Sequence, residues 1–387
     1  MERIRLLRIT TVPISLQYLL RGQLSFMQKH GMEVMAVSAE GPEVQIITEA
    51  GIPHAIIPFT RAITPVRDFL CLLKLIQLIR IFKPQIVHSH TPKAGLIGML
   101  AAWWCSVPVR LHTVAGLPLM EATGIKRWVL QLTEKATYFC STEIYVNSKS
   151  LVSFIQSEFK AQNLKLKTIG NGSSNGIDLE YFSVTQDLEL AATDVRCQLS
   201  IQSGEFLFCF VGRMVRDKGM VELIQAFLKI CESGKKVRLL LVGHFEDSLD
   251  PLPKHIHEVI DTHNNIFKAG FKSDVRPWIL ASDALVLPSY REGFPNVLLQ
   301  AGALEKPSIA TNINGCNEII LDGKTGWLVP TKDPEALQQA MESVMCDEKW
   351  CKEAGRYARN FVADNFDQSY VWNEILKEYR YHLSHVS

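Results

Sequence analysis

The second half of the chain alternates short apolar segments with helical segments, and this alternation constrains the fold more than any other feature. Short, almost continuously apolar strands that are joined by helices are typical of a parallel sheet with helices on both faces. The sequence therefore predicts an α/β domain built on an open parallel sheet. The expected strands are Phe206–Gly212, Val237–Gly243, Ile266–Gly270, Ala284–Leu287, Ser308–Thr311 and Trp327–Val329.

The first half repeats this pattern, and at 387 residues the chain is longer than a single core usually supports. Two domains are therefore expected, with a boundary in the turn-rich stretch 170–178. The predicted domains are 1–175 and 176–366, followed by a helical segment 367–387. Expected strands are Ile4–Ile9, Glu33–Val37, His54–Pro58, Pro84–His88, a strand from Val109, Glu143–Asn147 and Lys165–Ile169. Expected helices are 16–31, Glu43–Ala50, Pro65–Phe82, Leu96–Trp104 and 124–139.

Two loops of the second half carry residue types that suit a sugar diphosphate. Glu292 follows the strand Ala284–Leu287, and a helix begins a few residues later, near Asn296. The first N–H groups of a helix favour an anion. In the other loop Gly212 ends a strand, and Arg213 and Lys218 follow it. Glycine lets the backbone approach a ligand, arginine binds phosphate bidentately, and lysine adds a point charge.

Both loops resemble motifs of the retaining family-4 glycosyltransferases, which have the two-domain GT-B fold. Glu292 and Gln300 match the Glu-x7-Glu signature, with glutamine in place of the second acid. Gly212, Arg213 and Lys218 match the Gly-Arg-x4-Lys-Gly diphosphate clamp. The resemblance implies that Glu292 touches the donor sugar and that Gln300 accepts a hydrogen bond from the ribose. An amide oxygen can accept such a bond, without the added strength of a charged acceptor.

The same resemblance implies the overall architecture and further donor contacts. Two Rossmann-like α/β domains would face each other across a cleft, with the helix 367–387 crossing back to the first domain. The first domain would bind the acceptor and the second the nucleotide-sugar. The other implied donor contacts are Gly293, Phe294, Pro295, Asn296 and Val297, together with Phe271 and Lys272 near the base.

The first half offers His90, Thr91 and Lys93 at the exit of the strand Pro84–His88, where a sugar or phosphate could sit. Related enzymes often place a donor-contacting histidine two or three residues after Thr113, where this chain has alanine and glycine. Either His90 or His112 could take that role, and each could equally be a structural histidine. A metal site is disfavoured, because neither a carboxylate nor a cysteine cluster accompanies the histidines.

The charges divide unevenly between the two halves. Residues 1–170 hold 19 Lys/Arg and 10 Asp/Glu, whereas residues 171–387 hold 22 and 30. The basic first half predicts an anionic surface or substrate. Nucleic acid is disfavoured, because no basic run with interleaved aromatic residues and no zinc-finger spacing is present. An anionic lipid or a lipid-linked diphosphate fits better.

Any membrane contact is expected to be peripheral, because the longest apolar run, 94–107, is too short to span a bilayer. The basic helix Pro65–Phe82 could cover the sheet or touch a membrane. The stretch Leu117–Trp128 reads either as an interfacial lip with exposed Leu and Met beside Lys126 and Arg127, or as a buried helix start. Nine cysteines without a Cys-x-x-Cys pair, and no signal peptide, favour reduced, buried thiols in a cytoplasmic protein, which could lie at the inner face of the membrane.

The resemblance implies a retaining transferase that uses a UDP-sugar as substrate, and we expect it to need neither a metal ion nor another cofactor. Metal independence follows from the lack of an Asp-x-Asp sequence in a strand-exit loop. The loops at 90–95 and 112–116 look most like the bacterial branch that builds lipid-linked oligosaccharides for capsule, exopolysaccharide or glycoprotein. A sugar-nucleotide epimerase or a non-catalytic sugar-nucleotide-binding protein of the same architecture remains an alternative. A dinucleotide oxidoreductase is disfavoured, because no Gly-x-Gly-x-x-Gly follows the first strand.

Overall fold

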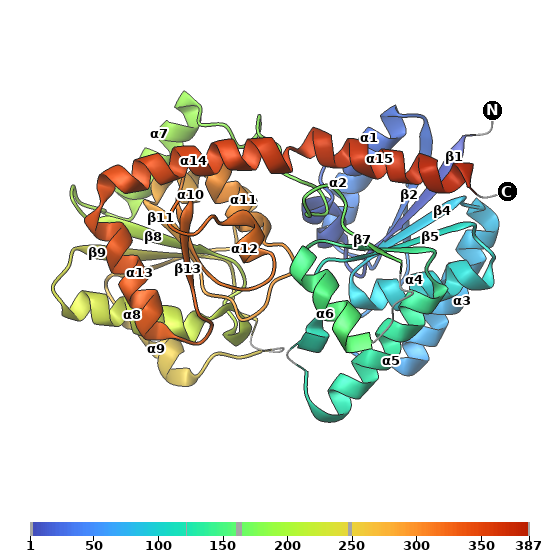
Figure 1. Ribbon diagram of the computed structural model, residues 1–387, viewed down its shortest axis with the longest axis horizontal. Helices are drawn as coiled ribbons and strands as arrows, with labels where there is room; N and C mark the ends of the chain where they lie inside the picture. Colours follow the sequence, from blue (N-terminus) through green and yellow to red (C-terminus); the bar gives the residue numbers. More distant parts are fainter. Residues whose placement is uncertain (1–2, 121, 160–164, 247–249, 386–387) are drawn as a thin grey trace. The chain divides into compact units, whose positions relative to one another are not determined.

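The computed structural model describes residues 3–120, 122–159, 165–246 and 250–385. Its contacts divide the chain into two compact units (Figure 1). Unit 1 comprises Met1–Gly176 and Gln368–Ser387, and unit 2 comprises Ile177–Asp367. Each division lies one residue from the boundary expected from the sequence. The C-terminal helix α15 belongs to unit 1, although unit 2 separates it in sequence from the rest of that unit.

Within the described residues, unit 1 has a seven-stranded parallel sheet in the order β3-β2-β1-β4-β5-β6-β7. Its strands are β1 Ile4–Ile9, β2 Met32–Ser38, β3 His54–Ile56, β4 Ile86–His90, β5 Val109–Val114, β6 Glu143–Val146 and β7 Leu166–Lys167. Its helices are the π-helix η1 Ser15–Leu19, α1 Gln23–Lys29, α2 Glu43–Glu49, α3 Pro65–Phe82, α4 Pro92–Trp104, the 3-10 helix η2 Pro118–Met120, α5 Gly124–Cys140, α6 Lys149–Phe159 and α15 Gln368–Ser384.

The two faces of this sheet support separate cores, because successive side chains of a strand point to opposite faces. Leu6 of β1 packs in one core with residues of α1 and α15. Leu7 and Ile9 of the same strand pack in another core with residues of α3 and α4. Figure 1 shows α15 running alongside α1, away from α3 and α4. The end of the chain therefore supplies part of the cover for the first strand.

One predicted helix of unit 1 is two helices in the structure. The apolar positions from Leu16 to Met27 predict a single helix, but η1 and α1 are separated by a turn at residues 20–22. Gly22 has a φ of 78°, which glycine adopts without strain. A Cβ at this position would also lie 2.6 Å from the ring of Trp372 in α15. The close approach of α15 explains a break that local periodicity does not reveal.

The helix predicted to begin at Leu96 begins four residues earlier. Pro92 occupies the first turn of α4, a position that tolerates proline because its N–H would be unpaired there. The sequence Pro-Lys-Ala-Gly suggests a loop, but Gly95 lies inside the helix, where a Cβ would clash with the ring of His112. The prediction that Lys93 stands in a loop is therefore wrong, since this residue lies in the first turn of α4.

Unit 2 has, among the described residues, a six-stranded parallel sheet in the order β10-β9-β8-β11-β12-β13. Each strand agrees with its prediction to within one residue at either end, which confirms the predicted fold class for this half. The strands are β8 Phe206–Val211, β9 Val237–Val242, β10 Ile266–Gly270, β11 Ala284–Leu287, β12 Ser308–Thr311 and β13 Gly326–Val329. The helices are α7 Gln186–Gln198, the 3-10 helix η3 Arg216–Lys218, α8 Met220–Glu232, α9 Lys254–Thr262, α10 Arg276–Ala281, α11 Asn296–Ala303, α12 Cys316–Ile319, α13 Pro334–Cys346 and α14 Glu348–Phe366.

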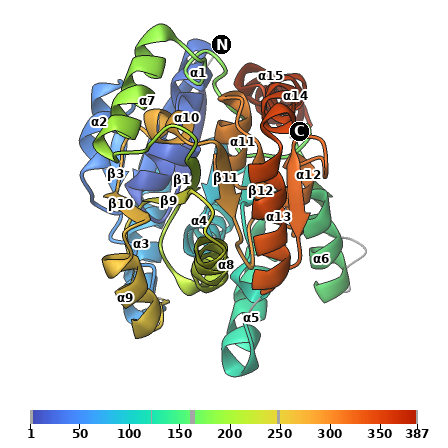
Figure 2. The same ribbon diagram turned by 90° about the vertical axis from the view of Figure 1, so that its left-hand side faces the viewer.

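Helices cover both faces of this second sheet (Figure 2). One layer contains α8, α9 and α13, and the other contains α7, α10, α11 and α14. The strands between them are almost entirely buried, as their apolar sequences predict. Because all six strands are parallel, their carboxyl ends and the loops that follow lie at one edge of the sheet.

The structure also bears on the predicted lip at Leu117–Trp128, on the cysteines and on membrane-spanning helices. Leu117 and Leu119 are buried, which favours the buried helix start over the exposed lip for this part of the stretch. All nine cysteines are free thiols, but Cys197 and Cys346 are exposed, so the expectation of buried thiols fails for these two. No helix among the described residues is long and apolar enough to cross a membrane.

Candidate active site

The candidate site of unit 2 lies where the strand order of its sheet reverses. From β8 the chain moves outward to β9 and β10, then returns to the other side of β8 with β11. The loops after β8 and β11 therefore leave the sheet as neighbours and diverge. Open α/β sheets bind ligands in the crevice at this point, beyond the carboxyl ends of the strands. The loops at this point contain Lys218 and Glu292.

Lys218 and Glu292 are in direct contact. The Lys218 Nζ atom lies 2.5 Å from Glu292 Oε1, and the hydroxyl of Ser289 donates to the same oxygen at 2.7 Å. The two charged side chains are only 18% and 13% exposed, so solvent screens their attraction less than at an open surface. An anion that binds Lys218 would have to compete with Glu292. Displacement would leave the Glu292 carboxylate free to accept hydrogen bonds.

The loop that holds Glu292 is supported by the end of β12 and by the segment that follows this strand. The side-chain amide of Asn314 donates to the Glu292 carbonyl, and the Thr311 hydroxyl donates to the Ser289 carbonyl at 2.5 Å. Gly315 has a φ of 79°, and a Cβ there would lie 2.5 Å from the Gly293 carbonyl oxygen. The position of the Glu292 carboxylate is thus fixed by close packing as well as by its ion pair.

Arg213 stands on the same loop as Lys218 but has a different partner. Its guanidinium forms an ion pair with Glu246, which follows β9. The backbone here is crowded, because Gly243 approaches the Gly212 carbonyl so closely that a Cβ would overlap it. The structure therefore brings Lys218 and Glu292 together and places Arg213 beside a second carboxylate. Each cation already carries an acidic counter-ion.

Sequence reasoning missed two contacts of the loop after β11, one with the segment after β8 and one with the first turn of α8. Arg291 Nη2 lies 2.6 Å from Asp217 Oδ2, and the hydroxyl of Tyr290 donates to the two Glu222 carboxylate oxygens at 2.7 and 2.8 Å. A signal was present, because Asp217 precedes Lys218 in one loop and Arg291 precedes Glu292 in the other. Two adjacent pairs of opposite charge permit two ion pairs between the loops.

The remaining predicted donor contacts fall into two groups. Gly293, Phe294 and Pro295 are buried, whereas Asn296, Val297 and Gln300 are partly exposed on α11. The helix has no side-chain cap, so its first N–H groups are open to a ligand. After β10, Phe271 is exposed, and the Lys272 ammonium lies 4.6 Å from the centre of the Trp278 ring.

In unit 1 the predicted site histidines are buried and uncharged. The guanidinium of Arg8 donates to His90 Nε2 at 2.7 Å, while His112 Nδ1 pairs with the Ser89 hydroxyl at 2.9 Å. Burial is the main cause that lowers the pKa of His90 far below its usual range and that of His112 to about 4. Both rings are therefore neutral at pH 7. Thr91 Oγ1 lies 2.7 Å from the hydroxyl of Thr11.

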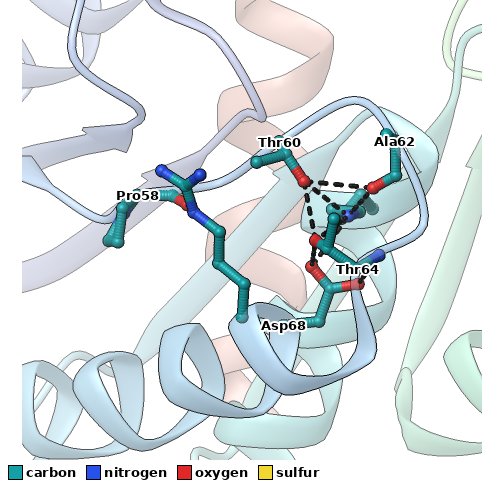
Figure 3. A network of polar contacts seen from close by, with 7 residues as sticks. Pro58, Thr60, Ala62, Thr64 and Asp68 are labelled. Carbon is teal, nitrogen blue, oxygen red and sulfur yellow. Dashed lines mark hydrogen bonds and ion pairs between the residues drawn. The ribbon is translucent and has the colours of Figure 1, made fainter.

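Figure 3 shows the polar side chains of Thr60, Thr64 and Asp68 gathered at the start of α3, and Lys93 bonds to this network. Its ammonium lies 2.7 Å from Asp68 Oδ1 and donates to Thr60 Oγ1 at 3.0 Å and to the Ala62 carbonyl. Asp68 also accepts from the Thr64 hydroxyl at 3.0 Å. A phosphate or sugar at Lys93 would therefore compete with Asp68. Among the described residues, no group of three His, Cys, Asp or Glu side chains is arranged to hold a metal ion.

Two family models match the chain, and together they span most of it. Residues 192–361 match the model described as glycosyl transferases group 1, and residues 20–172 match the one described as glycosyl transferase 4-like domain. A capsular polysaccharide biosynthesis glycosyltransferase from Staphylococcus aureus is 35% identical over 395 residues, which cover 98% of this chain and 97% of that protein.

A second relative and one solved structure agree with these matches. The UDP-Gal:alpha-D-GlcNAc-diphosphoundecaprenol alpha-1,3-galactosyltransferase of Escherichia coli is 27% identical over 312 residues, 79% of this chain and 78% of that protein. The Anabaena protein HepE, solved in complex with UDP and glucose, aligns with a TM-score of 0.82 over 97% of this chain and 99% of that chain. At 17% identity the structural likeness shows the fold alone.

Proposed function

The chain belongs to the group 1, family-4-like glycosyltransferases and has their GT-B fold, and we propose that it transfers a hexose or N-acetylhexosamine from a UDP-sugar to a lipid-diphosphate-linked glycan. The names of the two relatives, one for capsular polysaccharide and one for a diphosphoundecaprenol acceptor, support this proposal. The reaction would serve capsule, exopolysaccharide or glycoprotein glycan assembly at the cytoplasmic face of a membrane.

The contact between Lys218 and Glu292 carries this proposal. An ordinary surface ion pair has no reason to lie at a switch point of the sheet or to be held in place by a neighbouring segment. This pair lies at the switch point, and the side chain of Asn314 bonds to the backbone of Glu292. The donor diphosphate would replace Glu292 as the partner of Lys218. Glu292 would then accept hydrogen bonds from hydroxyl groups of the donor sugar, and Gln300 would accept one from the ribose.

The leaving group determines what the cations must do. As the sugar–phosphate bond breaks, negative charge accumulates on the diphosphate. Arg213, Lys218 and the open N–H groups of α11 would stabilise that charge, a role in which one donor is often worth about 10²–10³ in rate. Because these groups neutralise the diphosphate, the proposed reaction needs no divalent cation. Activity that disappears with EDTA and returns with Mg²⁺ would contradict this part of the proposal.

We propose that the reaction retains the anomeric configuration and proceeds on the front face of the sugar. The leaving phosphate would then take the proton of the acceptor hydroxyl. A double displacement would instead require a carboxylate that attacks the anomeric carbon and forms a covalent glycosyl-enzyme. Mass spectrometry of the enzyme quenched during turnover distinguishes the two routes, and an adduct of one sugar mass would refute front-face attack.

The activity is tested by measuring UDP release from a panel of UDP-sugars. Each donor is offered alone and with synthetic diphospholipids that carry N-acetylglucosamine, glucose or galactose. A transferase releases UDP rapidly only when the acceptor is present, and mass spectrometry finds the acceptor heavier by one sugar. An epimerase would convert the donor alone, and a binding protein would do neither. Lys218→Ala serves as the inactive control.

We also propose that unit 1 rests on an anionic membrane through the adjacent helices α3, α4 and α5. Large apolar side chains are exposed along this surface, which fits the interfacial role of aromatic residues. Lysine and arginine side chains of the same helices would meet anionic lipid headgroups. The exposed apolar residues of the surface are Val66, Phe69, Leu70, Leu73, Ile81, Trp103, Trp104, Ile125, Trp128, Leu132 and Phe139.

Vesicle co-sedimentation tests this contact. The double variant Trp104→Ser, Trp128→Ser should bind vesicles containing phosphatidylglycerol less well than the wild type does. Tyr357→Ser, which changes an exposed aromatic residue of unit 2, provides the matched control and should leave binding unchanged. The double variant Lys126→Glu, Arg127→Glu is a less specific test. Arg127 forms an ion pair with Glu158 at 2.6 Å, so this variant would also break a contact within unit 1. Equal sedimentation of the wild type and the tryptophan variant would exclude this surface.

A further inference from the structure

A small cavity of about 190 Å³ lies at the carboxyl ends of β4 and β5 in unit 1. Its walls are mostly apolar and include Ala115 and Gly116, which follow β5. A water molecule takes up about 30 Å³ in the liquid, so the space is suited to a group of several heavy atoms. His112 and Glu134 also line it. The carboxyl ends of parallel strands are the usual location for ligands.

Glu134 is a buried acid beside Tyr138, whose hydroxyl likewise has no hydrogen-bond partner among the described residues. The residue lies on α5 and is 4% exposed, and its Oε2 atom has no hydrogen-bond partner among the described residues. Burial raises the pKa of this carboxyl to about 7, although Tyr138 one turn later acts in the opposite direction. Burying an unpartnered carboxyl group destabilises the folded chain. Such a group in a well-packed protein calls for an explanation.

The hydroxyl groups of the threonines that line the cavity are already paired within the protein, as is one ring nitrogen of His112. His112 Nδ1 pairs with Ser89, and Thr113 Oγ1 lies 2.7 Å from His88 Nε2. The Thr91 hydroxyl lies 2.7 Å from the hydroxyl of Thr11. Among the described residues, Glu134 is therefore the one carboxyl group that a ligand in the cavity would meet, on a wall that otherwise suits carbon and hydrogen.

We propose that this cavity receives the edge of a sugar ring of the glycan acceptor, and that the carboxylate of Glu134 accepts a hydrogen bond from one of its hydroxyl groups. The C–H groups of the ring would pack against Ala115 and Gly116. This inference rests on the proposed function, which supplies the class of acceptor. It assigns to α5 a binding residue that lies in neither of the two motifs that resemble the family.

The experiment measures binding rather than turnover and uses the full chain. The probes are the diphospholipids that carry N-acetylglucosamine, glucose or galactose, and UDP is titrated separately. Glu134→Leu removes the acceptor oxygens at similar volume, and Glu134→Gln keeps a weaker, neutral one. The dissociation constant of the bound probe should rise about 10- to 100-fold in Glu134→Leu and less in Glu134→Gln, because hydrogen bonds to charged groups are the stronger ones. UDP affinity should not change.

Glu143→Gln is the matched control, since Glu143 is a half-buried acid of the same unit that does not line the cavity. It should bind the probes as the wild type does, and melting curves should show that all variants are folded. Equal probe affinity in the wild type and Glu134→Leu would overturn the inference while leaving the proposed function intact. If the wild type binds UDP but none of the three probes, the proposed class of acceptor is wrong and the inference falls with it.

Discussion

The sheets of the two units follow the same strand order up to an extra edge strand in unit 1, but the charged residues at their switch points differ. In unit 2 the order reverses between β8 and β11, and in unit 1 it reverses between β1 and β4. The loops of unit 2 carry partly exposed ion pairs, Lys218 with Glu292 and Asp217 with Arg291. The strands of unit 1 instead carry a buried arginine.

Arg8 of β1 is 1% exposed, and its recorded partners are all uncharged. It donates to His88 Nδ1 at 2.5 Å, to Gln23 Oε1 at 2.7 Å, to His90 and to the hydroxyl of Tyr379. Burial and the nearby guanidinium lower the pKa of both histidines, which keeps them neutral and able to accept. The charge is dispersed over neutral acceptors.

The comparison teaches that topology locates a crevice, whereas burial decides how the residues beside it are used. In unit 2 the cations keep partly exposed acidic partners, which the donor diphosphate would displace under the proposed function. In unit 1 the guanidinium is committed to holding β1, β4 and α15 together. We expect changes at the first site to affect turnover and changes at the second to affect folding.

The largest effect is expected at the unit 2 site. Lys218→Ala should lower the turnover number about 10²- to 10³-fold, because it removes a cation from the developing diphosphate charge. Lys229→Ala, which breaks an exposed pair with Glu335 in the same unit, should leave turnover unchanged. The measurement is UDP release at saturating donor and acceptor. A Lys218 variant with wild-type turnover would remove the contrast between the two units.

The next effect concerns the pH dependence of stability in unit 1. Because burial raises the pKa of Glu134 to about 7, the folded state binds this proton more tightly than the unfolded state does. Its contribution favours folding at pH 5 and is lost as the pH rises through 7, a change of about 3 kcal/mol. Glu134→Gln should therefore stabilise the protein relative to the wild type at pH 8 more than at pH 5. Denaturant titrations at both pH values measure the difference, and equal differences would contradict the raised pKa.

A smaller loss is expected from Tyr379→Phe, which removes one acceptor from the Arg8 network. Leaving a buried donor unsatisfied costs about 1–3 kcal/mol. Unfolding by denaturant should show this loss, while UDP affinity should remain that of the wild type. If UDP affinity falls with stability unchanged, the network of unit 1 serves the ligand site rather than the fold.

The smallest effect is expected from Arg291→Ala. Its ion pair with Asp217 is about a quarter exposed, and such pairs contribute about 0.2–1 kcal/mol. The variant should lose little stability and should weaken UDP binding less than Lys218→Ala does. A loss as large as that of Lys218→Ala would show that the two ion pairs act as one unit.

Most of the fold could be predicted from the sequence, because its signals are local. A short apolar strand such as Ala284–Leu287 is bounded by turn residues and is recognisable by itself. The break at Gly22 was not predictable, because it depends on Trp372, some 350 residues away. Similarly, the helix beginning at Pro92 looked like a loop until the packing of Gly95 against His112 was known.

The site was predictable only where its residues match a motif. Lys218 and Glu292 are candidates because of the loops that hold them, and their direct contact follows from the switch point. Glu134 carries no signal in the sequence, since a glutamate on an amphipathic helix ordinarily faces solvent. The Arg8 network was not predicted for another reason. Its partner Tyr379 comes 371 positions later in the chain, and local sequence patterns do not reveal such a contact.

The position of α15 has a consequence for the order in which the chain acquires its structure during synthesis. Val371, Ile375 and Tyr379 belong to a core of unit 1, yet they leave the ribosome only after all of unit 2 has done so. Domains generally fold as units, in the order of their synthesis. Here the half that is made first is completed last. Nascent chains arrested after residue 366, with unit 2 outside the exit tunnel, should therefore contain a protease-resistant unit 2 and a protease-sensitive unit 1.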